Sequence, residues 1–413
     1  MNCRHCGTTL TYTFLDLGHA PPSNSFLSAY ELNRPEIYYP LKVKVCHDCW
    51  LVQTEDYTEA DALFTSEYAY FSSTSSSWLK HAENYANQVT HEFGLTSNSL
   101  VIEVASNDGY LLKNFITKNI PCLGIEPTAS TAVVAEKMGI PVLRKFFGES
   151  LGCQLAEKGQ KADLLIGNNV FAHVPDINDF TRGLKAALKP NGIITLEFPH
   201  LMQLIEHAQF DTVYHEHFSY LSLLIVHRIF SSEGLRVWKV EKLPTHGGSL
   251  RVYGCHDSDL RETHSSVIDL MEEECNRGLQ KLETYLNFQP RAEKIKNSLL
   301  TFLIVQKRTN KNVAAYGAAA KGNTLLNFAG VKTDLLSFVC DAALAKQGKF
   351  MPGSHLPILA PSVLNEIQPD FVLIFPWNIA GEIVRQHSYI TKWGGKFLVA
   401  VPDICIKEAL SDN

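Results

Sequence analysis

Four proton-handling side chains stand in consecutive positions at Tyr214-His215-Glu216-His217. Histidine titrates near neutral pH, and a neighbouring carboxyl or phenol can orient it or share its proton. A surface loop rarely needs such a density of these groups. The cluster therefore predicts acid/base catalysis, with structurally satisfied histidines as the alternative interpretation.

A strand-to-helix turn upstream of this cluster predicts a cofactor pocket. The segment Glu103-Val104-Ala105-Ser106-Asn107-Asp108-Gly109 has small residues that let the backbone approach a ligand, and the helix that follows offers free N–H groups. The turn is similar to the acidic-x-Gly-x-Gly-x-Gly turn of class I S-adenosylmethionine (AdoMet) methyltransferases, with Ala105 and Asn107 at positions where glycine is usual. The cofactor-binding residues predicted here are Glu103, Ser106, Asn107, Asp108 and Gly109.

Two later segments complete this predicted pocket. Glu126 closes the next strand, where an acidic side chain can accept hydrogen bonds from both ribose hydroxyls. Asn168 and Asn169 follow a later strand, at the sheet edge where such folds bind ligands. An intact Gly-x-Gly-x-x-Gly is missing, which favours AdoMet over NAD. A βαβ unit without a ligand is the alternative.

Two Cys-x-x-Cys pairs near the N-terminus predict a structural zinc ion. Four thiolates on two tight turns can close on one tetrahedral metal and leave no open position for catalysis. A small region with few apolar core residues needs such a staple. A redox pair, or substitution of a ligand by His5 or His47, is the alternative. The predicted ligands are Cys3, Cys6, Cys46 and Cys49.

Alternating strands and helices are expected to position these residues, which predicts a doubly wound parallel sheet. The expected strands are 100–104, 121–125, 141–143, 163–167 and 193–198, with helices at 110–118 and 132–138 and an antiparallel edge pair at 236–242 and 249–254. Helices are expected over 260–310. A second, smaller α/β unit is then expected, with strands at 313–317, 335–340, 371–375 and 396–401. The serine run 72–77 is either a flexible linker or an ordered segment packed through its aromatic neighbours.

The predicted fold class is therefore α/β in three parts. A small zinc-binding domain spans 1–58, a Rossmann-like AdoMet methyltransferase domain spans 59–258, and a helical connection with a smaller Rossmann-like domain spans 259–413.

Composition narrows the functional classes. The chain has 413 residues with 45% apolar and 19% charged residues, which is typical of a soluble globular protein. A net charge of −6 gives no electrostatic basis for binding nucleic acid. The N-terminus lacks an apolar signal region, and the apolar runs are too short to span a bilayer. We expect a cytoplasmic protein without membrane contact, and a monomer because no coiled-coil pattern is evident.

Two small-residue turns predict contacts with a phosphorylated substrate. His246-Gly247-Gly248-Ser249 offers backbone N–H groups and a hydroxyl for a pyrophosphate or sugar, with Arg251 as a phosphate ligand. The turn 316–323 ends in Lys321 and Asn323, which would hold the nucleotide end of the substrate. An edge hairpin is the alternative for the first turn. Trp377-Asn378 is expected to line the same cleft or to form a plain turn.

Taken together, these motifs resemble the sugar C-methyltransferases of deoxysugar pathways, over nearly the whole chain. The resemblance rests on the paired cysteines, Tyr70-Phe71-Ser72-Ser73 with Trp78 and His81, the cofactor turn, 169–174, 214–220, 246–251 and 316–323. Members methylate C3 of a nucleotide-linked 4-keto-6-deoxyhexose and bind it between the central and C-terminal domains.

The resemblance implies roles for the acid/base cluster. His217 is the implied base that removes the C3 proton, Glu216 orients it or shares the proton, and Tyr214 stabilises the oxyanion. His173 is implied to contact substrate. Tyr70 would close over the sugar, unless it is an ordinary core aromatic.

Rival functions remain at this point. An O- or N-methyltransferase acting on a similar sugar needs no enolisable ketone, and a zinc scaffold with degenerate nucleotide folds needs no catalysis. The nucleotide is either dTDP or GDP, and C3 carries either an amino or a hydroxyl group.

Overall fold

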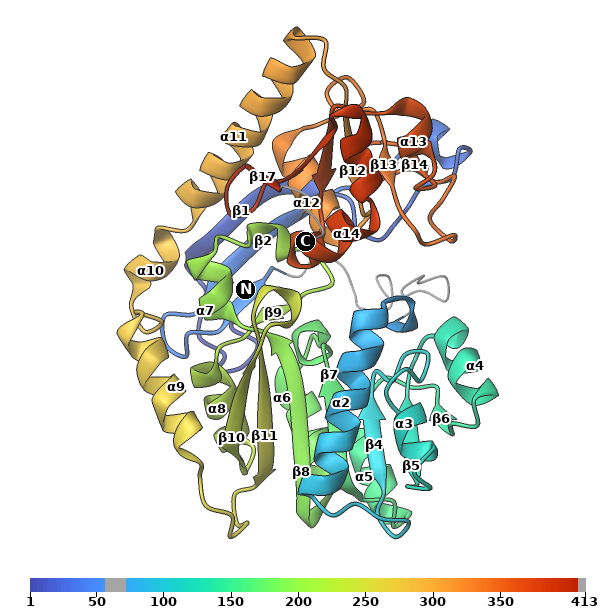
Figure 1. Cartoon of the computed structure of the whole chain (residues 1–413). Helices are drawn as coiled ribbons and strands as arrows, with labels where there is room; N and C mark the ends of the chain where they lie inside the picture. Colours follow the sequence, from blue (N-terminus) through green and yellow to red (C-terminus); the bar gives the residue numbers. More distant parts are fainter. Residues whose placement is uncertain (56–71, 408–413) are drawn as a thin grey trace.

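The computed structural model describes residues 1–55 and 72–407. The described strands form three sheets, which occupy the lower, middle and upper parts of Figure 1. The lower sheet is the large central one, the middle sheet belongs mainly to the N-terminal region, and the upper sheet belongs to the C-terminal region.

The large sheet has the strand order β10-β11-β8-β7-β4-β5-β6. Strands β4 to β8 pair in parallel, and β11 is antiparallel to both β8 and β10. The doubly wound sheet and its antiparallel edge pair are confirmed. Its strands are β4 Val101–Val104, β5 Cys122–Ile125, β6 Val142–Leu143, β7 Ala162–Asn168, β8 Leu188–Pro199, β10 Leu235–Leu243 and β11 Ser249–His256.

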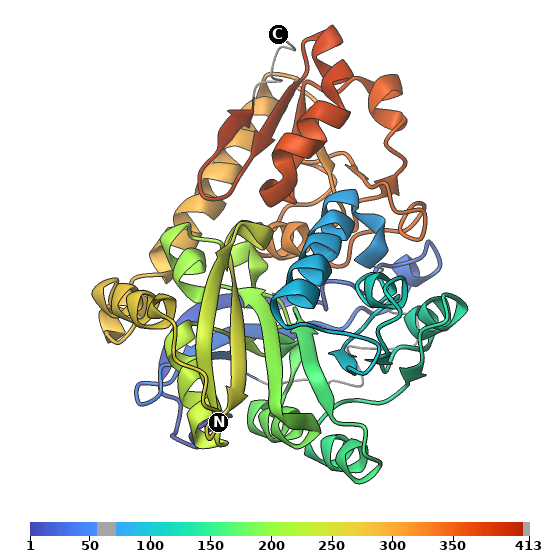
Figure 2. The same cartoon turned by 60° about the horizontal axis from the view of Figure 1, so that its bottom comes forward.

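Helices cover this sheet, and α2 lies along it in both views (Figures 1 and 2). They are α2 Ser76–Glu92, α3 Lys113–Ile116, α4 Ala129–Lys137, α5 Glu149–Glu157, α6 Ile177–Ala187 and α8 Leu223–Ser232, whereas α7 Leu201–Glu206 packs on the core of the N-terminal sheet. The serine run is ordered, because Ser75 caps α2 by accepting a hydrogen bond from the backbone N–H of Trp78. Helix α3 is shorter than predicted, since residues 110–112 belong to the turn before it.

The N-terminal sheet has the order β1-β2-β3-β9, and all its pairs are antiparallel. Its strands are β1 Tyr12–Ala20, β2 Tyr39–Val45, β3 Val52–Thr54 and β9 Ser219–Tyr220. Strand β9 comes from the predicted central domain and directly follows the acid/base cluster. The cluster is therefore tied by backbone hydrogen bonds to the zinc-binding region.

The C-terminal sheet has the order β14-β13-β12-β15-β16-β17, with β17 as its antiparallel edge. Its strands are β12 Val313–Tyr316, β13 Val339–Cys340, β14 Ile358–Leu359, β15 Phe371–Ile374, β16 Lys396–Val399 and β17 Cys405–Lys407. Helix α9 Ser265–Asn276 packs on β10 of the large sheet, and α10 Leu282–Leu286 and α11 Gln289–Arg308 lead from it to the C-terminal sheet. The helices of the C-terminal region itself are α12 Ala320–Ala329, α13 Val363–Ile367 and α14 Ala380–Gln386. The predicted strand at 335–340 is reduced to its last two residues.

One apolar core joins the three regions. It contains Leu15 of β1, Ile205 of α7 and Leu325 of α12, and Phe14 stacks on Phe288 with ring centroids 4.6 Å apart. Such shared burial favours one rigid arrangement. Among residues 1–55 and 72–407, no helix is both long and apolar enough to cross a membrane.

Candidate active site

The turn after β4 has left-handed backbone at two positions where glycine is usual in such turns. Ala105 has φ 57° and Asn107 has φ 50°, in the left-handed region, and Gly109 has φ 78°. A left-handed backbone costs a residue with a Cβ about 1–2 kcal/mol. The turn thus keeps its left-handed backbone at Ala105 although no glycine stands there.

Buried polar atoms without hydrogen-bond partners gather at this sheet edge. Among the described residues, such atoms include Ser106 Oγ, Asp108 Oδ1, Asn168 Oδ1 and Asn169 Oδ1. Each unpaired buried group costs roughly 1–3 kcal/mol, so a ligand that pairs with them is the simplest explanation. Burial, with Asp108 and Glu126 nearby, raises the pKa of Glu103 well above its usual value. These donors and acceptors fit a polar cofactor such as AdoMet.

Glu126 is fixed next to the turn. Its carboxylate accepts the backbone N–H of Asn107 at 3.0 Å and that of Thr128 at 2.8 Å, and burial raises its pKa. A carboxylate has about four acceptor positions, so these two bonds leave capacity for the hydroxyls of a ribose.

A short helix closes one side of this edge. In η2 (Ser72–Thr74), the backbone N–H of Ser72 donates to Asn107 Oδ1 at 3.0 Å, and that of Ser73 donates to Asp108 Oδ2 at 3.1 Å. Tyr70, predicted to close over the sugar, lies outside the described residues.

Replacing Glu126 with alanine should weaken AdoMet binding about 10–100-fold. Hydrogen bonds to a charged group contribute roughly 1.5–3 kcal/mol, and each 1.4 kcal/mol is about tenfold in affinity. Calorimetric titration with AdoMet measures the effect. The matched control is Glu136→Ala. It removes an exposed carboxylate on nearby α4 that pairs with Arg144. Equal affinities in both variants would show that Glu126 does not hold the cofactor.

Backbone carbonyls fix the tautomers of His217 in the acid/base cluster and of His173 next to it. His217 Nδ1 donates to the Thr212 carbonyl at 3.0 Å, because a carbonyl can only accept. Its Nε2 is therefore an acceptor, and the Tyr214 hydroxyl donates to it at 2.8 Å. In the same way, His173 Nδ1 donates to the Glu216 carbonyl at 2.7 Å. The rings of His173 and His217 meet edge to face, 4.6 Å apart.

Both imidazoles are neutral at pH 7. Burial lowers the pKa of His173 to about 4. Burial, with nearby His173, also lowers the pKa of His217 well below its usual value. A neutral imidazole with its Nε2 lone pair directed at a phenol is suited to accept a proton.

Glu216 does not orient His217 in this structure. Its Oε1 accepts a hydrogen bond from Asn24 Nδ2 at 3.1 Å, and burial raises its pKa. The orienting group is the Thr212 carbonyl instead. His215, the other histidine of the cluster, contacts the Pro40 carbonyl through Nε2 at 3.2 Å. This contact joins the cluster to the N-terminal region.

The predicted glycine turn lies beside the cofactor edge. His246 has φ 53°, and its Nε2 is 3.4 Å from Asn169 Nδ2. Gly247 has φ 88°, and a Cβ there would lie 2.4 Å from the Trp377 ring, so this position requires glycine. The Ser249 hydroxyl donates to the Thr245 carbonyl at 2.9 Å and stabilises the turn itself.

Arg251 lies in a buried ion pair. Its Nη2 is 2.9 Å from Glu197 Oε2 on β8, and the guanidinium lies over the Tyr85 ring. His81 Nε2 contacts the same carboxylate at 2.9 Å. Although burial opposes it, His81 and Arg251 hold the pKa of Glu197 below its usual value. The sequence predicted that Arg251 binds a phosphate of the substrate. In the structure its guanidinium is occupied by Glu197 and Tyr85 instead.

Replacing Arg251 with methionine should destabilise the protein by about 3–5 kcal/mol, because the buried carboxylate of Glu197 loses its guanidinium partner and keeps only His81 and Thr245. Urea unfolding measures this loss. The double variant Glu197→Gln with Arg251→Met removes both charges and should recover much of it. A single variant as stable as the wild type would show that the pair contributes nothing.

The C-terminal region contributes Lys321, at the start of α12. Its Nζ donates to Asn378 Oδ1 at 2.8 Å and lies 4.2 Å from the centroid of the Trp377 ring. Trp377 Nε1 in turn donates to Asp211 Oδ2 at 2.7 Å. The structure thus brings Lys321 together with Trp377-Asn378. Asn323 is fully buried, and its Oδ1 accepts from Asn327 at 3.2 Å.

The four N-terminal cysteines converge as predicted. Their Sγ atoms lie within 4.8 Å of one another, and two of the Sγ pairs are 3.5 Å apart. In each Cys-x-x-Cys turn the backbone N–H four residues on returns to the carbonyl of the first cysteine. This set of donors fits one tetrahedral zinc ion.

The zinc-binding turns are anchored to the large sheet's helices. Arg4 Nη1 donates to the Pro175 carbonyl at 2.9 Å, and His5 Nδ1 contacts Asn178 Oδ1 at the same distance. Arg228 of α8 donates to the Asp48 carbonyl at 3.0 Å. These contacts indicate a structural ion, and His5 is engaged away from the thiolates.

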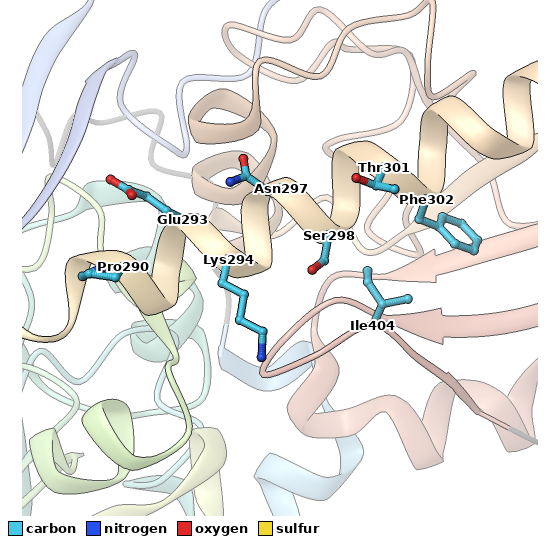
Figure 3. Close-up of a pocket in the computed structure, with 8 residues that line it drawn as sticks. All are labelled: Pro290, Glu293, Lys294, Asn297, Ser298, Thr301, Phe302 and Ile404. Carbon is cyan, nitrogen blue, oxygen red and sulfur yellow. The ribbon is translucent and has the colours of Figure 1, made fainter.

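A surface groove of about 670 Å³ runs along α11 (Figure 3). Its lining includes Lys294, Ser298 and Ile404, and none of its lining residues has a predicted role. The groove shares no residue with the buried polar site around Glu126 and His217, so we place the chemistry at that buried site.

Together, the fold and the site define a class of protein: a zinc-containing methyltransferase that uses AdoMet. Three family models match in the expected order. A zinc binding domain matches residues 3–64, a methyltransferase domain 78–240, and a C-methyltransferase C-terminal domain 244–402.

A curated relative extends this match over the whole chain. C-methyltransferase NovU from Streptomyces niveus is 33% identical over 401 residues, covering 97% of this chain and 95% of the relative. The chain belongs to this family of zinc-containing, AdoMet-dependent C-methyltransferases.

Solved methyltransferase structures are more distant. Magnesium protoporphyrin IX methyltransferase from Synechocystis PCC 6803 with bound SAM is 12% identical, covering 43% of this chain and 79% of its own, with a TM-score of 0.33. The glycopeptide N-methyltransferase MtfA complexed with SAM is 11% identical, covering 42% and 94%, with a TM-score of 0.34. Likenesses this weak say nothing about the substrate.

Proposed function

We propose that this C-methyltransferase acts on C3 of a nucleotide-linked 4-keto-6-deoxyhexose. The observation that carries the proposal is the neutral His217, whose Nε2 meets the Tyr214 hydroxyl at 2.8 Å. Carbon methylation needs a carbanion equivalent, and a ketone at C4 acidifies the C3 proton. A neutral imidazole in a dry site is a suitable base for that proton.

The proposed base is the His217–Tyr214 pair. The C3–H bond breaks, its proton ends on His217 Nε2 directly or through the Tyr214 hydroxyl, and its electron pair moves onto the C4 oxygen. The Thr212 carbonyl keeps Nδ1 protonated and so stabilises the imidazolium that forms. AdoMet supplies the methyl group as an electrophile.

The remaining site residues have proposed binding roles. Glu103, Ser106, Asn107, Asp108, Gly109, Glu126, Asn168 and Asn169 hold the cofactor. His173, His246 and Gly247 contact the sugar, Ser249 stabilises the turn that carries His246 and Gly247, and Glu216 is held in place by Asn24. Monomeric state, the nucleotide and the contribution of Tyr70 stay predictions.

Mass spectrometry tests the proposal directly. The enzyme is incubated with AdoMet and a dTDP- or GDP-linked 4-keto-6-deoxyhexose. We expect a mass gain of one methyl group, located on C3 by NMR. No gain with either sugar, while AdoMet still binds, would overturn the substrate assignment.

Hydrogen exchange separates this function from O- or N-methylation of a similar sugar. A C-methyltransferase should exchange the C3 proton for solvent deuterium without AdoMet. An O- or N-methyltransferase has no need to do so, and its product would carry the methyl group on oxygen or nitrogen.

A further inference from the structure

The ammonium of Lys321 has unused donors in the site. In the described part of the chain it donates one hydrogen bond, to Asn378, whereas an ammonium group has three N–H donors. Lys321 is half-buried, so part of its side chain is not covered by packed protein. The Trp377 ring holds the charge from one side by a cation–π contact.

Lys321 is tied to the segment that orients the base. Thr324, one turn later on α12, donates through Oγ1 to the Val213 carbonyl at 2.8 Å, and Trp377 holds Asp211. Thr212, which lies between Asp211 and Val213, supplies the carbonyl that fixes the His217 tautomer. The first turn of α12 therefore packs on the backbone that sets the geometry of proton transfer.

The Trp377 ring links the ammonium to the turn that carries His246: Nζ lies 4.2 Å from the ring centroid, and a Cβ at Gly247 would lie 2.4 Å from the same ring. The charge of the ammonium contributes, after burial, to lowering the pKa of His217 and of His246. Burial lowers the pKa of Lys321 itself to about 8, opposed by Asp211, and the group stays mainly cationic at pH 7.

We propose that Lys321 is a catalytic residue that stabilises the oxyanion formed at C4 of the substrate, instead of gripping the diphosphate. This role rests on the proposed function. As the C3–H bond breaks and the proton passes to the His217–Tyr214 pair, the electron pair reaches the C4 oxygen, and Lys321 donates a hydrogen bond to it. The Tyr214 hydroxyl proton already points at His217 Nε2, so a second donor is needed for that oxygen.

Two readouts on Lys321→Met distinguish the two roles. The first is the saturating rate of deuterium exchange at C3 in D₂O without AdoMet, and the second is the affinity for free dTDP and GDP. We expect exchange to fall about 10²–10³-fold, as when one oxyanion donor is removed, while nucleotide affinity changes less than about threefold. Lys321→Arg keeps the charge and should recover part of the exchange.

The controls cover folding and the proposed function. Lys294→Met removes an exposed lysine on α11 and should match the wild type in both readouts. Unchanged exchange in Lys321→Met, or a tenfold loss of nucleotide affinity with a normal saturating exchange rate, would overturn the inference. A wild type that exchanges neither sugar would instead refute the proposed function. If Lys321→Met does not fold, Lys321→Gln is measured against the same criteria.

Discussion

Alanine in place of His217 should reduce methyl transfer by about 10²–10⁴-fold, the usual contribution of a general base, while AdoMet still binds. The reason is geometric as well as electrostatic. His217 is the acceptor for the Tyr214 hydroxyl, and its other nitrogen is committed to the Thr212 carbonyl. Removing the ring removes the imidazole nitrogen that accepts the proton of the phenol. Single-turnover methyl transfer and deuterium exchange at C3 should fall together.

His207→Ala is the matched control, because this exposed histidine directly follows α7 in the same domain. It should retain wild-type rates. Exchange that persists at the wild-type rate in His217→Ala would place the base elsewhere, with Glu216 as the next candidate. Loss of AdoMet binding would instead indicate that the ring has a structural role.

Serine in place of Cys46 should remove the zinc ion and unfold the N-terminal region. Structural zinc contributes about 10–16 kcal/mol to folding in small zinc domains, comparable to the ~5–15 kcal/mol that stabilises a whole protein. Cys46 is fully buried and its Sγ lies 3.5 Å from that of Cys6. We expect about one zinc per chain in the wild type by elemental analysis, and a large fall in zinc content and melting temperature in Cys46→Ser.

The matched control is Cys153→Ser, which alters an exposed cysteine on α5 outside the zinc cluster. It should keep both the metal and the melting temperature. Equal zinc content in Cys46→Ser and the wild type would remove Cys46 from the ligand set. Zinc loss without any destabilisation would show that the region folds on its apolar core alone.

Local sequence patterns predicted the elements and the cofactor turn well. The cofactor turn lies between β4 and β5, and Glu126 directly follows β5. These features belong to one βαβ unit, so their spacing along the chain is enough to predict that they lie together. The two cysteine pairs are equally local, since each forms one tight turn. The strands β13 and β8 differ from expectation in length, because neighbouring strands rather than propensity decide where pairing ends.

Long-range contacts explain what the sequence did not show. The Thr212 carbonyl that orients His217 is a backbone group, and no side chain marks it. Asn24 reaches Glu216 from another domain, across 192 positions. For Arg251 a signal existed: Glu197 is a carboxylate inside a buried strand, which requires a cation. Helix α8 was also detectable, because Ser222 caps an apolar run.

The short strand β9 has a consequence for how activity arises during folding. It begins two residues after His217 and pairs with β3, and Thr54 Oγ1 donates to the His217 carbonyl at 3.2 Å. On its other side the base depends on α12 through Val213. Contacts that span such long stretches of chain form late, since their loop-closure entropy must be overcome first. The cofactor pocket can form within the central domain, whereas the proton-transfer site exists only once the amino- and carboxy-terminal regions have docked on either side of it. Catalytic competence is thus a property of the completed chain, acquired last and absent from any single domain.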